Sequence, residues 1–324
     1  MDKLQLIKAP IMKEFGAFKA LFDSSLQSSN PLLNEVLIHI KQRNGKMLRP
    51  ILTLLVAKGL GDVTETVFHA SISLELLHTA SLLHDDVVDE SDERRGQPSV
   101  NAVYDNKISV LVGDYILSNS LKHAALTNST QIVDVIARLG QNLAEGEIIQ
   151  LTNVQSTSFD EKVYFDVIRK KTAALFSSCA AVGAISTGAP EEKVGKVYNF
   201  GELVGLAFQI KDDIFDYYPS PEIGKPTEND MHEGKLTLPA LYVINHTEDA
   251  SVREIALRIR SLKASAGEIS HFVDIVKSNG GIDYANKIMH EYRDRAVGML
   301  KEMVSDDICE TLTAYIDFVV DREK

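Results

Sequence analysis

The sequence of 324 residues has no tryptophan and only two cysteines, Cys179 and Cys309. Two cysteines are too few for a disulfide framework and are typical of a reducing compartment. The first residues, from Met1 to Gln5, lack the charged and then apolar pattern of a secretory signal. No apolar run is long enough to span a bilayer. We therefore expect a cytoplasmic protein.

Basic residues are also scarce, with 34 Lys and Arg against 46 Asp and Glu and a formal net charge of −12. Because a broad nucleic-acid surface needs a basic excess, we expect no nucleic-acid partner. An acidic chain can still contain a basic pocket, so this balance does not exclude a phosphorylated small molecule as ligand.

Strand-like alternation with hairpin signals is missing, whereas helical periodicity covers most of the chain. Apolar residues recur at three- and four-residue steps in 4–22, 50–59, 66–84, 108–124, 130–150, 161–186, 192–217, 235–246, 251–263, 267–278, 281–303 and 307–320. Glycines and prolines fall between these segments, and an irregular stretch covers about 217–234. No linker or shift in composition divides the chain. We therefore predict an all-α protein with a single domain spanning residues 1–324.

Two acidic motifs of the form DDxxD stand at the ends of apolar helical segments. They comprise Asp85, Asp86 and Asp89 in the first motif, and Asp212, Asp213 and Asp216 in the second. Helical spacing places the first and last aspartate of a motif on one face, one turn apart. Three carboxylates at the end of a buried helix are costly unless a cation neutralises them, and Mg²⁺ commonly lies between carboxylates and substrate phosphates. The pair of motifs therefore predicts a diphosphate held through several Mg²⁺ ions, whereas one motif alone could be a solvated helix end.

Basic residues are grouped around these motifs. They are Lys46 and Arg49 near a helix start, Arg94 and Arg95 after the first motif, Lys171 before the small-residue helix, and Lys225 and Lys235 after the second motif. Each alone could be an ordinary surface charge. Their grouping favours binding of diphosphate oxygens, for which arginine forks and helix N-termini are suited.

Together these motifs resemble the polyprenyl synthetase family, the trans-isoprenyl diphosphate synthases. The matching motifs run in family order from Gly45 to Pro239, and include Leu77-His78, Lys171-Thr172 and Gln209-x-Lys211 beside the two aspartate motifs. The resemblance implies a helical bundle around a deep central cavity, the isoprenoid synthase fold, and a homodimer. It also implies a prenyltransferase that joins isopentenyl diphosphate head-to-tail to an allylic diphosphate of farnesyl or geranyl type, with three Mg²⁺ ions per site.

The family pattern assigns roles to individual positions. Binding of Mg²⁺ and the allylic diphosphate falls to all six aspartates of the motifs. Further allylic contacts fall to Arg94, Lys171, Thr172, Gln209, Lys225 and Lys235, and isopentenyl diphosphate contacts to Lys46, Arg49, His78 and Arg95. The residues most directly tied to the chemistry would be Asp85, Asp86, Asp89, Lys171, Asp212, Asp213 and Lys235. For His78 the alternative is a histidine satisfied within its own helix. Glu228 stands where longer-chain members often have glycine, in a loop that we expect to close over the substrate.

The residues preceding the first motif bear on product length. At 1.5 Å per residue, Ser81 lies about 6 Å below Asp85, Leu77 about 12 Å and Leu74 about 16 Å, along one stripe. In the family, aromatic residues four or five positions before the motif stop growth early. Because Ala80 and Ser81 are small, we expect a long product of about six to ten isoprene units (about C30–C50), as for a quinone side chain.

Three alternatives remain open: a short-chain synthase, a class I terpene cyclase and a non-catalytic synthase subunit. Cyclases usually carry a different second motif, and such subunits typically lose one or both motifs, whereas this chain keeps both. A long apolar product could also require transient membrane contact for its release.

Overall fold

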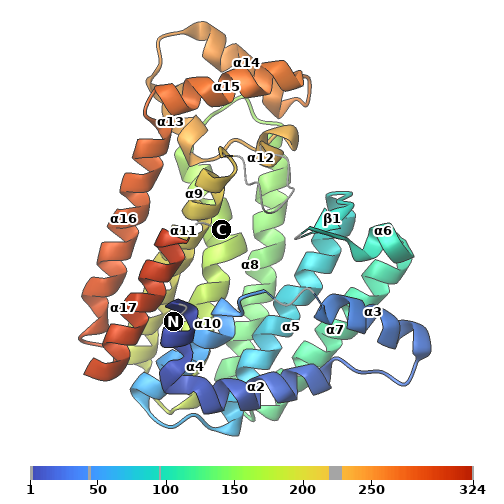
Figure 1. Ribbon diagram of the computed structural model, residues 1–324, viewed down its shortest axis with the longest axis vertical. Coiled ribbons are helices and arrows are strands. Elements are labelled where there is room, and N and C mark those ends of the chain that lie inside the picture. The colour runs from blue at the N-terminus through green and yellow to red at the C-terminus, as the bar shows by residue number, and fades with distance from the viewer. Residues whose placement is uncertain (1–2, 43–44, 95, 219–227, 323–324) are drawn as a thin grey trace. The chain divides into compact units, whose positions relative to one another are not determined.

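A computed structural model describes residues 3–42, 45–94, 96–218 and 228–322. Helices dominate these residues (Figure 1). The only strands among them are β1 (Glu93–Arg94) and β2 (Gln97–Pro98), which pair antiparallel. The prediction of an all-α protein is therefore confirmed. None of the described helices is both long and apolar enough to cross a lipid bilayer.

The chain divides into two compact units. Unit 1 comprises Met1–Gln141, Leu175–Gly201 and Gly298–Tyr315, and unit 2 comprises Asn142–Ala174, Glu202–Val297 and Ile316–Lys324. The boundaries fall inside or at the start of helices, so α8, α10, α11, α16 and α17 contribute residues to both units. The single domain spanning residues 1–324 stays a prediction.

Unit 1 is built mainly from the first third of the chain. Its helices are α1 (Lys3–Lys8), the 3₁₀ helix η1 (Ala9–Ile11), α2 (Met12–Ser25), α3 (Pro31–Lys41), α4 (Leu48–Leu60), α5 (Glu65–Val88), α6 (Val100–Tyr104), α7 (Asn106–Leu126) and parts of α8 (Thr130–Val154), α10 (Ala174–Ser186), α11 (Glu191–Phe215), α16 (Gly281–Leu300) and α17 (Asp306–Asp321).

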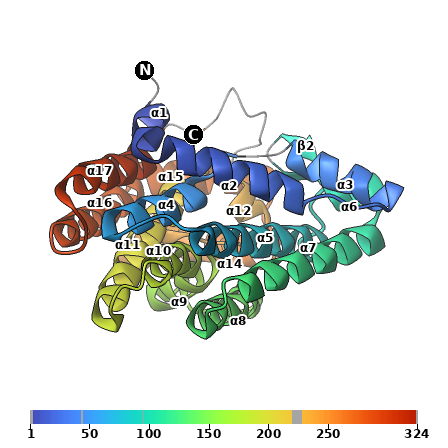
Figure 2. The same ribbon diagram turned by 90° about the horizontal axis from the view of Figure 1, so that it is seen from below.

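Helix α5 carries the first motif and is buried along much of its length. It lies side by side with α7 in both views (Figures 1 and 2). Ser73 and Ser120 bridge the two helices, because each hydroxyl donates to the other residue's carbonyl at 2.8 and 2.7 Å. Small side chains at these positions allow the two helices to approach closely along the first half of α5.

The helix rich in small residues, α10, packs closely on the unit 1 part of α11. Most of its residues are buried. A Cβ atom added at Gly201 on α11 would lie 2.6 Å from the carbonyl oxygen of Phe176 and 2.7 Å from Cα of Ser177. Glycine is therefore required where α11 crosses the backbone of α10.

Unit 2 contains the remaining elements around a core of its own. They are the end of α8, α9 (Glu161–Ile168), the π-helix η2 (Arg169–Ala173), the second half of α11, α12 (Asn229–His232), α13 (Leu238–His246), α14 (Ala250–Arg260), α15 (Ala266–Ser278), α16 (Gly281–Leu300) and the end of α17. Phe272, Leu241 and Ile210 are buried in its core. Three sides of this core come from apolar stripes on α11, α13 and α15.

The structure divides two segments that periodicity predicted to be continuous. The first, 4–22, is interrupted by η1, which contains Pro10. Proline cannot donate a helix hydrogen bond, so the chain tightens there into a 3₁₀ turn. The second, 161–186, is interrupted by the π-helix η2 between α9 and α10. Apolar spacing does not reveal an inserted residue of this kind.

Candidate active site

The first acidic motif closes helix α5 in unit 1. The helix ends at Val88, and Asp89 caps it by donating its backbone N–H to the carbonyl of Asp85 at 2.8 Å. Asp85 and Asp89 are half-buried, whereas Asp86 is 1% exposed. The predicted helical placement of this motif is therefore confirmed, with the middle aspartate turned inward.

Arg94 forms an ion pair with the buried Asp86. Its Nε donates to Oδ1 of Asp86 at 2.5 Å, from the short hairpin of β1 and β2 that follows the helix. Gly96 in the turn of this hairpin has a φ of 74°, which favours glycine. The hairpin therefore brings Arg94 back to the first motif, with which the sequence pattern groups it. Arg95 lies outside the described residues.

A cavity of about 70 Å³ lies beside this pair, entirely within unit 1. His78, Asp86 and Arg94 line it. Arg49 is in the first turn of α4, half-buried, with its guanidinium carbon 5.4 Å from the ring centre of Phe176. Lys46 is exposed and precedes the helix rather than opening it. Of the four residues assigned to isopentenyl diphosphate, His78 and Arg49 have partly buried side chains, Lys46 is exposed, and Arg95 is outside the described residues.

The second acidic motif begins on the part of α11 that belongs to unit 2, with Asp212 and Asp213 on the helix and Asp216 just after its end. Asp213 is 3% exposed and both its carboxylate oxygens accept hydrogen bonds. The Tyr164 hydroxyl donates to Oδ2 at 2.5 Å, and Nε2 of Gln209 donates to Oδ1 at 2.8 Å. The Thr172 hydroxyl in turn donates to Oε1 of Gln209 at 2.7 Å, which fixes the orientation of that amide. Thr172 and Gln209, which were assigned to the allylic substrate, therefore form a chain of hydrogen bonds that ends at Asp213.

Asp216, the last residue of the second motif, caps the start of α12. Its two oxygens accept the backbone N–H groups of Asn229 and Asp230, each at 3.1 Å. Its own carbonyl accepts the N–H of Glu228 at 3.1 Å. Asp216 therefore contacts the chain again at residues 228–230. Residues 219–227, which include Lys225, lie outside the described residues. Glu228 has a φ of 73°, in the left-handed region that glycine favours.

Asp212 is held by a residue from the end of α17. Nη2 of Arg322 donates to Oδ1 of Asp212 at 2.8 Å and to the carbonyl of Phe208 at 3.0 Å. Its guanidinium carbon lies 3.8 Å from the ring centre of Phe208, and the side chain is 9% exposed. The first aspartate of the second motif therefore has a buried arginine as a counter-ion.

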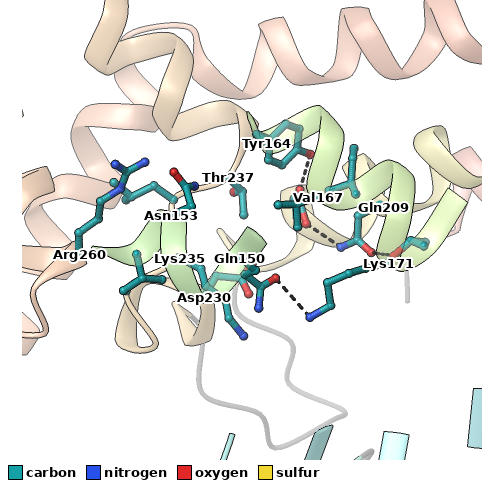
Figure 3. Close-up of a pocket in the computed structure, with 16 residues that line it drawn as sticks. Gln150, Asn153, Tyr164, Val167, Lys171, Gln209, Asp230, Lys235, Thr237 and Arg260 are labelled. Atoms are coloured by element: carbon teal, nitrogen blue, oxygen red, sulfur yellow. Dashed lines mark hydrogen bonds between the residues drawn. The ribbon is translucent and has the colours of Figure 1, made fainter. Parts of the chain in front are cut away.

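Lysines and carboxylates meet in a cavity of about 240 Å³ in unit 2 (Figure 3). Lys171, Lys235, Asp213 and Asp230 all line it. Lys171 donates to the carboxylate of Glu147 and to Oε1 of Gln150 at 3.3 Å. A Cβ atom at Gly146 would lie 2.8 Å from Cγ of Lys171, so glycine leaves room for the lysine to cross α8.

Lys235 enters the same cavity from the segment after α12. Its Nζ donates to Glu233 at 2.5 Å, and its backbone N–H donates to the carbonyl of Asp230 at 2.7 Å. Thr237 and Arg260 also line this cavity. The predicted grouping of Lys171 and Lys235 with the second motif is therefore realised within one unit.

Three carboxyl groups in or next to this cavity have pKa values above the usual value of an aspartate. Burial raises the pKa of Asp213 to about 7, although hydrogen bonds from Tyr164 and Gln209 oppose the shift. Burial also raises the pKa of Asp216, against its two backbone N–H donors. For Asp230, burial together with Asp216 and Asp213 raises the pKa well above its usual range. Such a cluster of carboxyl groups fits a divalent cation, whose charge would reverse these shifts.

The cluster does not form a complete metal cage. Within the described ranges, no three His, Cys, Asp or Glu side chains converge closely enough to hold a metal ion by themselves. Mg²⁺ is commonly bound by one or two carboxylates together with waters and substrate phosphates. The residues present therefore fit a metal that arrives with a phosphorylated ligand.

Sequence reasoning missed four residues of these sites: Tyr164, Glu147, Asp230 and Arg322. Tyr164 stands seven residues before Lys171, a spacing that places two side chains on one helix face and could have drawn attention to it. Asp230 opens the Asp230-x3-Gly234-Lys235 stretch that matches the family pattern but was assigned no role, and Glu147 had no signal beyond its charge. Arg322 is more than a hundred residues from Asp212 in sequence, so no local pattern links them.

The comparison with known proteins decides the family. The sequence model described as polyprenyl synthetase matches residues 30–276. The chain belongs to the polyprenyl synthetase family. It is 35% identical to the octaprenyl diphosphate synthase of Haemophilus influenzae, with 99% of this chain and 97% of that protein covered.

Two solved structures extend the comparison. The geranylgeranyl pyrophosphate synthase from Bacteroides thetaiotaomicron is 50% identical, with a TM-score of 0.88, and the match covers 99% of this chain and all of that one. The polyprenyl synthase from Caulobacter crescentus CB15, complexed with calcium and isoprenyl diphosphate, is 30% identical with a TM-score of 0.92, covering 99% and 98%. The predicted family and the isoprenoid synthase fold are therefore confirmed, whereas the roles of individual residues stay predictions.

Proposed function

We propose that this protein is a prenyltransferase that condenses isopentenyl diphosphate head-to-tail with an allylic diphosphate. The observation that carries this proposal is the cavity in unit 2, where Lys171 and Lys235 stand beside Asp213 and Asp230. Lysines bind diphosphate oxygens, and buried carboxylates attract the divalent metal that accompanies them. This pairing matches the chemistry expected of a member of the polyprenyl synthetase family.

The allylic diphosphate would bind in the unit 2 cavity. Lys171 and Lys235 exchange their present carboxylate partners for diphosphate oxygens and stabilise the negative charge that develops on the leaving group. Gln209 holds Asp213, Thr172 holds Gln209, and both would add polar contacts to the substrate. Mg²⁺, with three ions per site, would polarise the diphosphate when bound. The proposed ligands of these ions are the carboxylates of the two acidic motifs: Asp85, Asp86, Asp89, Asp212, Asp213 and Asp216.

Isopentenyl diphosphate would bind beside the first motif. Arg49 and His78 supply partly buried donors in unit 1, and exposed Lys46 adds a cation. Arg94, which pairs with Asp86, stays assigned to the allylic substrate. Because the allylic carbon becomes cationic, the double bond of isopentenyl diphosphate attacks it, and released diphosphate accepts the proton. No protein base is therefore required. Arg95, Lys225 and the closure of the 217–234 loop remain sequence predictions.

The reaction is tested by incubating the purified chain with farnesyl diphosphate, isopentenyl diphosphate and Mg²⁺. Linear extension supports a synthase, a hydrocarbon formed without isopentenyl diphosphate indicates a cyclase, and activity only with an added partner indicates a subunit. Lys171→Gln should lower kcat/KM for the allylic substrate by about 10–100-fold, the value of a charge-assisted hydrogen bond. Lys170→Gln is the matched control, because Lys170 pairs with Glu145 and does not line the cavity.

For the product we propose a long chain of about C30–C50, supported by the similarity to octaprenyl diphosphate synthase and by small residues before the first motif. The geranylgeranyl pyrophosphate synthase at 50% identity favours a shorter, twenty-carbon product as the second candidate. Mass spectrometry of the assay product separates the two.

The residues proposed to set product length differ in their packing. Ala80, Leu74 and Leu77 are buried at 1%, 1% and 7% exposure, so a phenylalanine at Ala80 would overpack the helix interface. Ser81 is half-buried and is the better test. Ser81→Phe should shorten the product, with Ser24→Phe at an exposed position of α2 as control. An unchanged product would place the growing chain elsewhere.

We further propose a homodimer formed through α7. Val110, Leu111, Leu121 and Leu126 on this helix are 39%, 63%, 58% and 46% exposed, and a second copy would cover such apolar surface. Leu121→Glu should yield monomers in analytical ultracentrifugation, whereas the equally exposed Leu262→Glu should not. A cytoplasmic location, with transient membrane contact to release an apolar product, completes the proposal.

A further inference from the structure

Tyr164 is the least expected residue of the unit 2 cavity. It lies on α9, is 6% exposed, and packs in the apolar core of unit 2 with Phe159 and Ile168. Its hydroxyl nevertheless points toward the cavity and donates to Asp213 at 2.5 Å, as Figure 3 shows. A buried phenol needs a partner, and here the partner is an aspartate of the second motif.

The hydrogen bond completes the immobilisation of Asp213. A carboxylate rotates easily about its last side-chain bond, because that torsion is broad and roughly two-fold. Gln209 lies one turn away on the same helix and holds only Oδ1. Tyr164 holds Oδ2 from a different helix, so the two donors together fix the plane of the carboxylate. Thr172 fixes Gln209 in turn, and Tyr164 is anchored by the core rather than by a mobile loop.

Orientation matters because each carboxylate oxygen has two lone-pair sites. One site on each oxygen of Asp213 is occupied by a donor, and the remaining sites then have fixed directions. Outer hydrogen-bond partners of this kind typically change metal affinity by about 10–100-fold when they are removed.

We propose that Tyr164 is a positioning residue that orients the Asp213 carboxylate toward the divalent metal and its diphosphate. The inference rests on the proposed function, in which Asp213 contributes to the metal site. In this proposal Tyr164 acts through Asp213, to which its hydroxyl donates, and is assigned no metal-ligand role of its own.

The test is Tyr164→Phe, which removes one oxygen and keeps the ring. We expect binding of Mn²⁺ in the presence of inorganic diphosphate, measured by calorimetry, to weaken about 10-fold or more. KM for isopentenyl diphosphate should stay within about two-fold, because that substrate binds elsewhere in the proposal. Excess metal should restore kcat.

Tyr284→Phe is the matched control. The Tyr284 hydroxyl donates to Glu161 at 3.0 Å, also within unit 2, but neither residue lines the cavity. This variant loses the same type of hydrogen bond and should bind Mn²⁺ as the wild type does. Equal weakening in both variants would show a general structural effect and overturn the inference.

A double-mutant cycle keeps the inference testable if Tyr164→Phe loses stability. In the Asp213→Asn background, Tyr164→Phe should cause no further loss of Mn²⁺ affinity, since the tyrosine acts through that carboxylate. Additive losses would overturn the inference. Equal Mn²⁺ affinity of the wild type and Tyr164→Phe would overturn the inference alone, whereas a wild type that binds no metal with diphosphate would overturn the proposed function as well.

Discussion

Replacing Asp213 by asparagine should stabilise the metal-free protein at high pH and destabilise it at low pH. In the folded protein, burial raises the pKa of this carboxyl from 3.8 to about 7. At about 1.4 kcal/mol per pKa unit, holding the ionised form above pH 7 costs about 4 kcal/mol. Because the folded state binds the proton more tightly, the free energy of unfolding falls as pH rises from about 4 to about 7.

Asparagine removes the charge but also loses a hydrogen bond. Its amide oxygen can still accept one of the hydrogen bonds from Tyr164 and Gln209, but its amide nitrogen cannot accept the other, and this one mismatch costs about 1–3 kcal/mol. At pH 8 the variant should therefore gain about 1–3 kcal/mol in free energy of unfolding, and at pH 4 it should lose about the same amount.

Urea unfolding with a metal chelator, at several pH values between 4 and 8, measures this difference. Asp134→Asn serves as control, because Asp134 is 58% exposed and outside the cavity. A difference between wild type and Asp213→Asn that does not change with pH would refute the reasoning.

Three further predictions concern backbone strain, close packing and acid stability. Glu228→Gly should raise the free energy of unfolding by about 0.5–1 kcal/mol, because glycine relieves a left-handed φ; Glu228→Ala should not, since it retains Cβ and loses only the contact with Ser270. Gly201→Ala should cost about 1–3 kcal/mol in thermal or urea unfolding, through collision with the Phe176 carbonyl. His123→Gln should flatten the loss of stability between pH 6.5 and about 4, because burial lowers the pKa of His123 to about 4 and unfolding then takes up a proton. Equal stabilities of the two Glu228 variants, or an unchanged acid limb for His123→Gln, would contradict these expectations.

Sequence patterns predicted the helices and the grouping in unit 2 because both depend on local spacing. The DDxxD motif requires one helical turn, and Lys171-Thr172 stands close to the cavity residues of α9 and α11 once these helices pack. The same patterns identified α5 and α10 as buried helices, since their apolar positions surround the helix.

The missed features depend on contacts between distant segments or on single inserted residues. The pairing of Arg322 with Asp212 joins positions that share no motif. The role of Asp216 as a cap for α12 follows from the path of a later segment, and composition cannot predict that path. Lys171 lies in the π-helix η2. Sequence patterns do not show this, because one extra residue in a helical turn leaves the apolar periodicity nearly unchanged.

The ion pairs within each site have a consequence for affinity and its regulation. Lys171 already holds Glu147, and Asp212 already holds Arg322. If the proposed function holds, a diphosphate or metal ion would have to displace an internal partner, and its binding would exchange one ion pair for another. The free energy of binding would then be the difference between the attraction to the ligand and the attraction to the internal partner. This difference is smaller than either attraction alone. In the proposed function, a lone anion or a lone cation would therefore gain little on binding. A metal-bound diphosphate would displace both Glu147 and Arg322, and the site would then favour the pair over its separate parts.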